Sequence, residues 1–125
     1  MAVRIVRLGS ERSDGEGLRI GTVRRPPRGV AKKDFAQRDF YDVWFPLLAP
    51  SLATMKLGLT GRWKPFVKRY LREMAKADAS RALDLLAALS RSANFSVGCY
   101  CEDESRCHRS LLRKLLRSRG ANIRR

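Results

Sequence analysis

The chain has 125 residues and a formal net charge of +15, from 27 Lys and Arg against 12 Asp and Glu. Its length suits a single domain, and a hydrophobic content of 44% excludes a wholly disordered chain. We expect residues 1–125 to form one α/β domain that ends in a loose basic tail from about residue 120. The excess of positive charge favours polyanionic partners, although a basic surface without such a partner has the same composition.

The cysteines and the apolar runs indicate where the protein resides. Three cysteines, an odd number with no secretory leader before them, favour a reducing compartment over a disulfide framework. The longest apolar run, residues 43–55, is too short to span a bilayer and is interrupted by Pro46 and Pro50. We therefore expect a cytoplasmic protein without a membrane partner, and the sequence predicts no oligomeric state.

The first half of the chain has the pattern of strands. Residues 3–9 alternate apolar and basic side chains, and residues 18–25 form a second candidate strand that stops at two prolines. The aromatic content of residues 39–45 predicts a third strand.

The second half has mainly the pattern of helices. Residues 61–77 place apolar side chains three and four apart, and residues 78–91 repeat the pattern after a candidate cap at Asp78. Residues 94–101 return to the period of a strand, within which Gly98 suggests close approach by another backbone or a ring, and a helix follows at 107–119. The order predicts an α/β fold with a small, mostly parallel sheet of about four strands, flanked by helices and ending in a βα unit.

Four short stretches resemble a family of bacterial and archaeal proteins of unknown function. They are "RGV" at 28–30, "VWFPLLAPS" at 43–51, "WKPFVKRYL" at 63–71, and Cys99 followed by "CHR" at 107–109. On these residues the chain resembles the family that contains the YeaO-like proteins. The resemblance implies a compact α/β domain with a pocket near Arg28 and the Cys-His-Arg segment, and it brings no activity. The chain departs from that family at Cys101, where an acidic residue is common.

The segment from 99 to 109 contains all three cysteines and the only histidine, and it admits several interpretations. We favour an anion site at the start of the 107–119 helix, where free backbone donors meet Arg28, His108 and Arg109. The ligand would be a phosphorylated small molecule or a nucleic acid, with Arg113, Lys114 and Arg117 on the last helix as candidate nucleic-acid contacts.

Three other interpretations stay open. Cys101, Cys107 and His108 are candidates for a cysteine-dependent enzyme acting on a phosphorylated or sulfur-containing substrate, although Glu102, Asp103 and Glu104 have no evident role beside a thiolate. Cys99, Cys101, Cys107 and His108 have the composition of a zinc site. Strand geometry disfavours it, because the Cα atoms of Cys99 and Cys101 would lie about 6–7 Å apart, and we expect no cofactor. Alternatively, all these side chains are structural.

Overall fold

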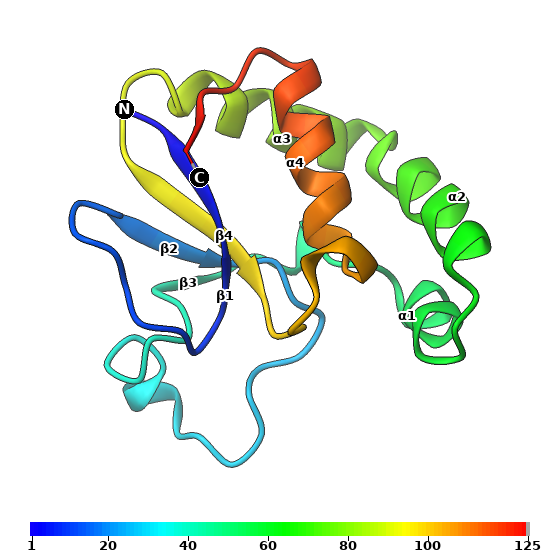
Figure 1. Ribbon diagram of the computed structural model, residues 1–125, viewed down its shortest axis with the longest axis horizontal. Helices are drawn as coiled ribbons and strands as arrows, with labels where there is room; N and C mark the ends of the chain where they lie inside the picture. The colour runs from blue at the N-terminus through cyan, green and yellow to red at the C-terminus, as the bar shows by residue number, and fades with distance from the viewer. Residues whose placement is uncertain (125) are drawn as a thin grey trace.

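Five parallel strands form one sheet in the computed structural model, which describes residues 1–124 (Figure 1). The strands are β1 (Val3–Arg7), β2 (Leu18–Gly21), β3 (Val43–Trp44), β4 (Phe95–Cys99) and β5 (Ile123–Arg124), in the spatial order β3-β2-β4-β1-β5. The central strand, β4, places Phe95 beside Val3 of β1 on one side and beside Leu18 of β2 on the other. The expected α/β fold with a parallel sheet and a final βα unit is therefore confirmed.

Four α-helices lie together on one side of the sheet (Figure 1). They are α1 (Leu52–Leu59), α2 (Trp63–Met74), α3 (Ala77–Leu89) and α4 (His108–Ser118), with short 3-10 helices at Lys32–Asp34, Pro46–Leu48 and Glu104–Arg106. The main core fills the space between these helices and the sheet. Its fully buried members include Val3, Tyr70, Leu83, Val97 and Leu112.

The other face of the sheet carries a buried ion pair. Arg19 of β2 is fully buried and donates to Glu16 over 2.7 and 3.0 Å, while Ser96 of β4 donates to the same carboxylate over 2.7 Å. The backbone carbonyls of Ser10 and Asp39 accept from the remaining amino group of Arg19. The segments that follow β1 and β2 are thereby fastened to this face.

Several expected boundaries are corrected. Of residues 39–45 only Val43 and Trp44 pair as a strand, because the chain before them turns so that Tyr41 packs against Gly21. Helix α3 begins at Ala77 with Lys76 in the cap position, so Asp78 lies in the first turn and is not the cap. Strand β4 ends at Cys99, two residues before the expected end.

The end of the chain differs most from the expectation of a loose tail. Ile123 and Arg124 pair with Val3 and Arg4 of β1, and the Val3 amide donates to the Asn122 carbonyl over 2.9 Å. Residues 120–124 therefore form the turn after α4 and an edge strand, and Arg125 lies outside the described residues.

Candidate functional site: a cavity at the start of α4

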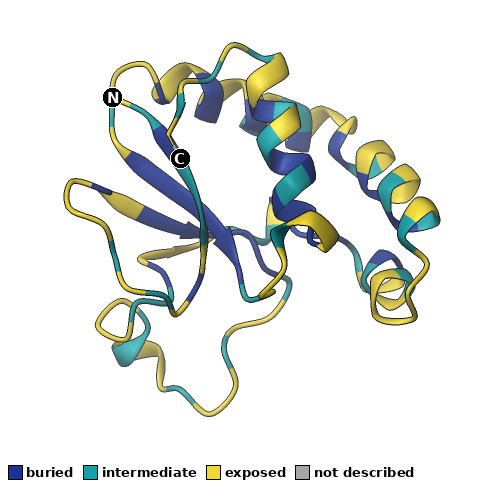
Figure 2. Ribbon diagram, viewed as in Figure 1, coloured by how far each residue is buried: buried dark blue, intermediate teal, exposed yellow. Residues whose placement is uncertain are grey.

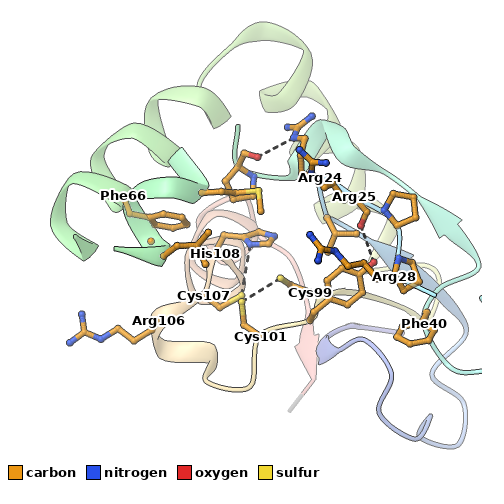
Figure 3. A pocket seen from close by; sticks show the side chains of 18 residues that line it. Arg24, Arg25, Arg28, Phe40, Phe66, Cys99, Cys101, Arg106, Cys107 and His108 are labelled. Atoms are coloured by element: carbon orange, nitrogen blue, oxygen red, sulfur yellow. Dashed lines mark hydrogen bonds between the residues drawn. The ribbon is translucent and has the colours of Figure 1, made fainter. Parts of the chain in front are cut away.

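The carboxyl ends of β2 and β4 open into a cavity of about 730 Å³, beside the first turn of α4 (Figure 3). We call it the arginine-lined cavity. Its lining comprises Val23, Arg24, Arg25, Pro26, Pro27, Arg28, Phe40, Pro50, Met55, Gly58, Leu59, Phe66, Cys99, Tyr100, Cys101, Arg106, Cys107 and His108. In open parallel sheets this edge is the usual place for a ligand.

The three cysteine sulfurs gather at one place on the cavity wall. Their Sγ atoms all lie within 4.8 Å of one another, and those of Cys99 and Cys101 are 3.7 Å apart. A strand extending to Cys101, as expected from the sequence, would hold Cys99 and Cys101 apart. The strand instead ends at Cys99 and the chain bends at Tyr100, which returns the Cys101 side chain toward its neighbour. Cys99 and Cys107 are buried, whereas Cys101 is exposed.

His108, the first residue of α4, is held in a fixed orientation beside Cys107. Its Nε2 lies 2.8 Å from the carbonyl oxygen of Thr22, and its Nδ1 lies 3.8 Å from Cys107 Sγ. Since a carbonyl only accepts hydrogen bonds, Nε2 carries a proton. In the neutral ring Nδ1 is therefore a proton acceptor that faces the thiol.

The pKa values of the three thiols are shifted in different directions. Contacts from the thiols of Cys101 and Cys99, followed by that of His108, lower the pKa of Cys107. Contacts with Cys101 and Cys107 raise the pKa of Cys99, and the contact with Cys107 raises the pKa of Cys101. Of the three thiols, Cys107 therefore has its pKa shifted toward the thiolate, and it lies at the positive end of the α4 dipole.

Four arginines belong to the lining of the cavity. Arg24, Arg25 and Arg28 come from the segment after β2, and Arg106 comes from the far side, with its guanidinium 5.9 Å from the centre of the Trp63 ring (Figure 3). Arg24 donates to the carbonyls of Ala49 and Pro50. Among residues 1–124, no carboxylate lines the cavity and no ion pair involves any of these four arginines.

Arg109 occupies a different place from Arg28. It is buried to all but 4%, donates from Nη2 to the Cys101 carbonyl, and has an Nε that lacks a partner within the described chain. It does not belong to the cavity lining, whereas Arg28 and His108 do. The structure thus brings two of the three expected anion-binding residues to one cavity and places the third behind the 101–107 loop.

The acidic residues 102–104 are turned away from the thiols. Asp103 accepts from the backbone and side chain of Ser105, Glu104 pairs with Arg113 through two contacts of 2.8 Å, and Glu102 lies 3.6 Å from Arg7. Their role is to shape the loop between β4 and α4. Of the basic residues expected to contact nucleic acid, Arg113 is held in this pair, while Lys114 and Arg117 are exposed.

With this geometry established, the chain was compared with known proteins. A family model described as the active DUF488-N3 subclade (DUF488-N3a) matches residues 3–120. The chain belongs to this family. A domain-of-unknown-function family is thus confirmed, and comparisons with curated proteins and with solved structures found no match.

Three further residues of this DUF488-N3a protein escaped the sequence analysis. Thr22 orients His108 through its carbonyl, Tyr100 donates to the Arg25 carbonyl over 3.0 Å, and Arg106 belongs to the cavity lining. Thr22 acts through its backbone carbonyl and Tyr100 contacts a carbonyl 75 residues away in the sequence, so the local sequence pattern gave no signal for either. Arg106 is next to Cys107 in the sequence and could have been identified from that position.

Across residues 1–124 of this DUF488-N3a chain, no helix has both the length and the apolar composition that crossing a bilayer requires.

Proposed function

We propose that the arginine-lined cavity binds an anionic small molecule with an aromatic or apolar body, of the nucleotide class. The observation that carries this proposal is a cavity with four arginines and no carboxylate among its described lining residues. The apolar share of the wall, from Phe40, Met55, Leu59 and Phe66, suits a base or ring, while the arginines suit phosphate.

The start of α4 supports the same ligand. Cys107 is the N-cap residue of α4, and its side chain makes no capping hydrogen bond. The backbone N–H groups of the first turn of α4 are therefore not occupied by the cap side chain and can donate to an anion. Arg25 and Arg28 are exposed and lie across the cavity from it. Phosphate groups placed between them would meet donors from both sides. The volume of about 730 Å³ is within the range of small-molecule sites.

The proposal is tested by calorimetric titration of metal-free protein with ATP, inorganic phosphate and adenosine. We expect ATP to bind most tightly, and Arg28→Ala to raise its Kd about tenfold, the effect of losing roughly 1.4 kcal/mol from a charge-assisted contact. Arg117→Ala, which removes an exposed arginine outside the cavity, is the matched control and should leave the Kd unchanged. Equal losses in both variants, or adenosine binding as tightly as ATP, would contradict the proposal.

A second candidate function is that of a cysteine-dependent enzyme on the same ligand. It is favoured by the position of Cys107, which lines the cavity with its Sγ 3.8 Å from His108 Nδ1. In this reaction His108 takes the thiol proton and the Cys107 sulfur attacks a phosphorus atom of the ligand. An S–P bond forms as the P–O bond to the leaving group breaks, and His108 returns the proton to the departing oxygen. Iodoacetamide should then modify Cys107 first in metal-free protein, and ATP should slow the modification. Preferential labelling of Cys101 would contradict it.

Three wider predictions accompany this proposal. A nucleic acid remains a candidate ligand, because Lys114 and Arg117 extend the basic surface along α4. We infer a cytoplasmic location from the three free cysteines, which favour a reducing compartment. The narrower resemblance to the YeaO-like proteins also stays a prediction within the confirmed family.

A further inference from the structure

We propose that Cys99, Cys101 and Cys107 together bind one thiophilic metal ion of the zinc type, through three thiolates at the wall of the arginine-lined cavity. The spacing of the sulfurs is the first support. A tetrahedral ion with metal–sulfur bonds of about 2.3 Å holds its ligands roughly 3.8 Å apart. Cys99 and Cys101 are separated by 3.7 Å between sulfurs, and all three sulfurs lie within 4.8 Å.

The buried guanidinium of Arg109 is an independent support. A charge removed from water needs a partner, yet no carboxylate within residues 1–124 forms an ion pair with Arg109, and its Nε lacks an acceptor. A divalent ion bound by three thiolates has a net charge of −1. Arg109 already holds the Cys101 carbonyl, so it lies next to this negative group and offsets it.

His108 is not the fourth ligand in this site. Within residues 1–124, the group of ligand atoms that lie within 4.8 Å of one another consists of the three sulfurs, and His108 Nε2 is directed at the Thr22 carbonyl. The ring instead approaches Cys107 from outside the cluster and orients that sulfur. Because all three cysteines line the cavity, the fourth coordination position faces it and is open to water or an anion.

Access to the site fits a metal that exchanges with solvent. Cys101 is exposed while Cys99 and Cys107 are buried, so an ion meets one sulfur at the surface and two below it. The acidic residues 102–104 contact other partners, which leaves sulfur as the only ligand chemistry of the cluster. That donor set selects zinc, cadmium or cobalt over magnesium or calcium.

Cobalt titration under anaerobic, reducing conditions tests the proposal. Reduced protein stripped with a chelator should take up one equivalent of Co²⁺ per chain with an intense thiolate-to-metal charge-transfer band, which one equivalent of Zn²⁺ then displaces. Cys101→Ser should lose most of the band and weaken Zn²⁺ binding at least tenfold. Glu102→Gln is the matched control, since this exposed neighbour contributes no ligand, and it should bind as the wild type does.

A second measurement, on the wild-type protein, tests the proposal if the Cys101→Ser variant fails to fold. In the folded wild type, Zn²⁺ should protect all three thiols from iodoacetamide together, with the modified cysteines identified by mass spectrometry. Absence of a charge-transfer band, or protection of fewer than three thiols, would overturn the proposal. Arg28→Ala should bind cobalt normally, so a failure of the metal site is distinguished from a failure of nucleotide binding.

Discussion

Gly98 of β4 pairs with Val6 of β1. A Cβ atom at this position would stand 2.7 Å from the carbonyl oxygen of Val6 and 2.8 Å from a methyl group of Leu8. The expectation that another backbone approaches this glycine is therefore confirmed. Because Val6 is paired within the sheet, its carbonyl cannot move without distorting the strand.

Alanine at position 98 should consequently destabilise the sheet beside the cysteine cluster. We expect Gly98→Ala to lower the free energy of unfolding by about 1–3 kcal/mol, the usual effect of overpacking. Urea denaturation followed by circular dichroism measures this change. Ser92→Ala, at an exposed position in the turn before β4, should cost less than about 0.5 kcal/mol, and an equal loss in both variants would contradict the packing argument.

Glu16 makes the stability of the protein depend on pH. Burial raises the pKa of this carboxyl, but hydrogen bonds from Arg19, Ser96 and the Ser13 amide outweigh it and lower the pKa from 4.5 to about 2. The unfolded chain thus binds the proton more tightly than the folded one. The stabilising contribution of the ionised Glu16 carboxylate is complete above about pH 4.5 and is lost as the pH falls toward about 2.

The corresponding variant is Glu16→Gln. Removing one partner of a buried pair leaves Arg19 uncompensated, so we expect a loss of about 3–5 kcal/mol near neutral pH. Denaturation between pH 7 and pH 2 should show a steeper decline for the wild type than for the variant. Parallel declines would show that Glu16 does not carry this dependence.

At the scale of elements, the two-residue strand β5 contributes to the stability of the fold. Ala121 and Ile123 pack against the main core, and Asn122 accepts from the Val3 amide. A chain that ends at Gly120 should therefore lose about 1–2 kcal/mol of unfolding free energy, most of it from Ile123. A truncated chain with unchanged stability in thermal denaturation would restore the idea of a loose tail.

The long periodic elements could be predicted from sequence, whereas the short ones could not. Helices α2, α3 and α4 have a clear apolar face, and β4 follows the alternation expected for it. Helix α1 was not distinguished because its exposed Leu52 and Leu59 and its Gly58 obscure that periodicity. Strands β3 and β5 have two residues each and depend on pairing with distant strands.

The same limit applies to the candidate site. The sequence predicts the βα turn, and Arg28 and His108 both line the cavity there, since their positions follow from where strands end and a helix starts. Their role in binding an anion stays a prediction. It did not predict the convergence of the three sulfurs, which depends on the bend at Tyr100. The burial of Arg109 was also missed, because the same helical spacing fits an exposed stripe.

At the scale of the whole molecule, the net charge is +15, and of the 27 Lys and Arg only four arginines line the cavity. Figure 2 shows exposed residues throughout the helical layer, and Arg19 and Arg109 are buried. Local arginines, rather than net charge alone, therefore decide where an anion binds.

Salt should then weaken ATP binding without affecting adenosine. Raising NaCl from about 0.05 to about 0.3 M shortens the screening length from roughly 14 to roughly 6 Å, so the Kd for ATP should rise several-fold. Calorimetry at each salt concentration measures this. An adenosine Kd that rises in parallel would point to a general salt effect on the protein.

The most direct test of the central claim is the location of the bound anion. In a ¹⁵N–¹H NMR titration with ATP, we predict that the perturbed amides cluster at residues 23–28 and 99–109, around the arginine-lined cavity. Shifts confined to Lys114, Arg117 and the exposed face of α4, or no saturable shifts at all, would contradict the account.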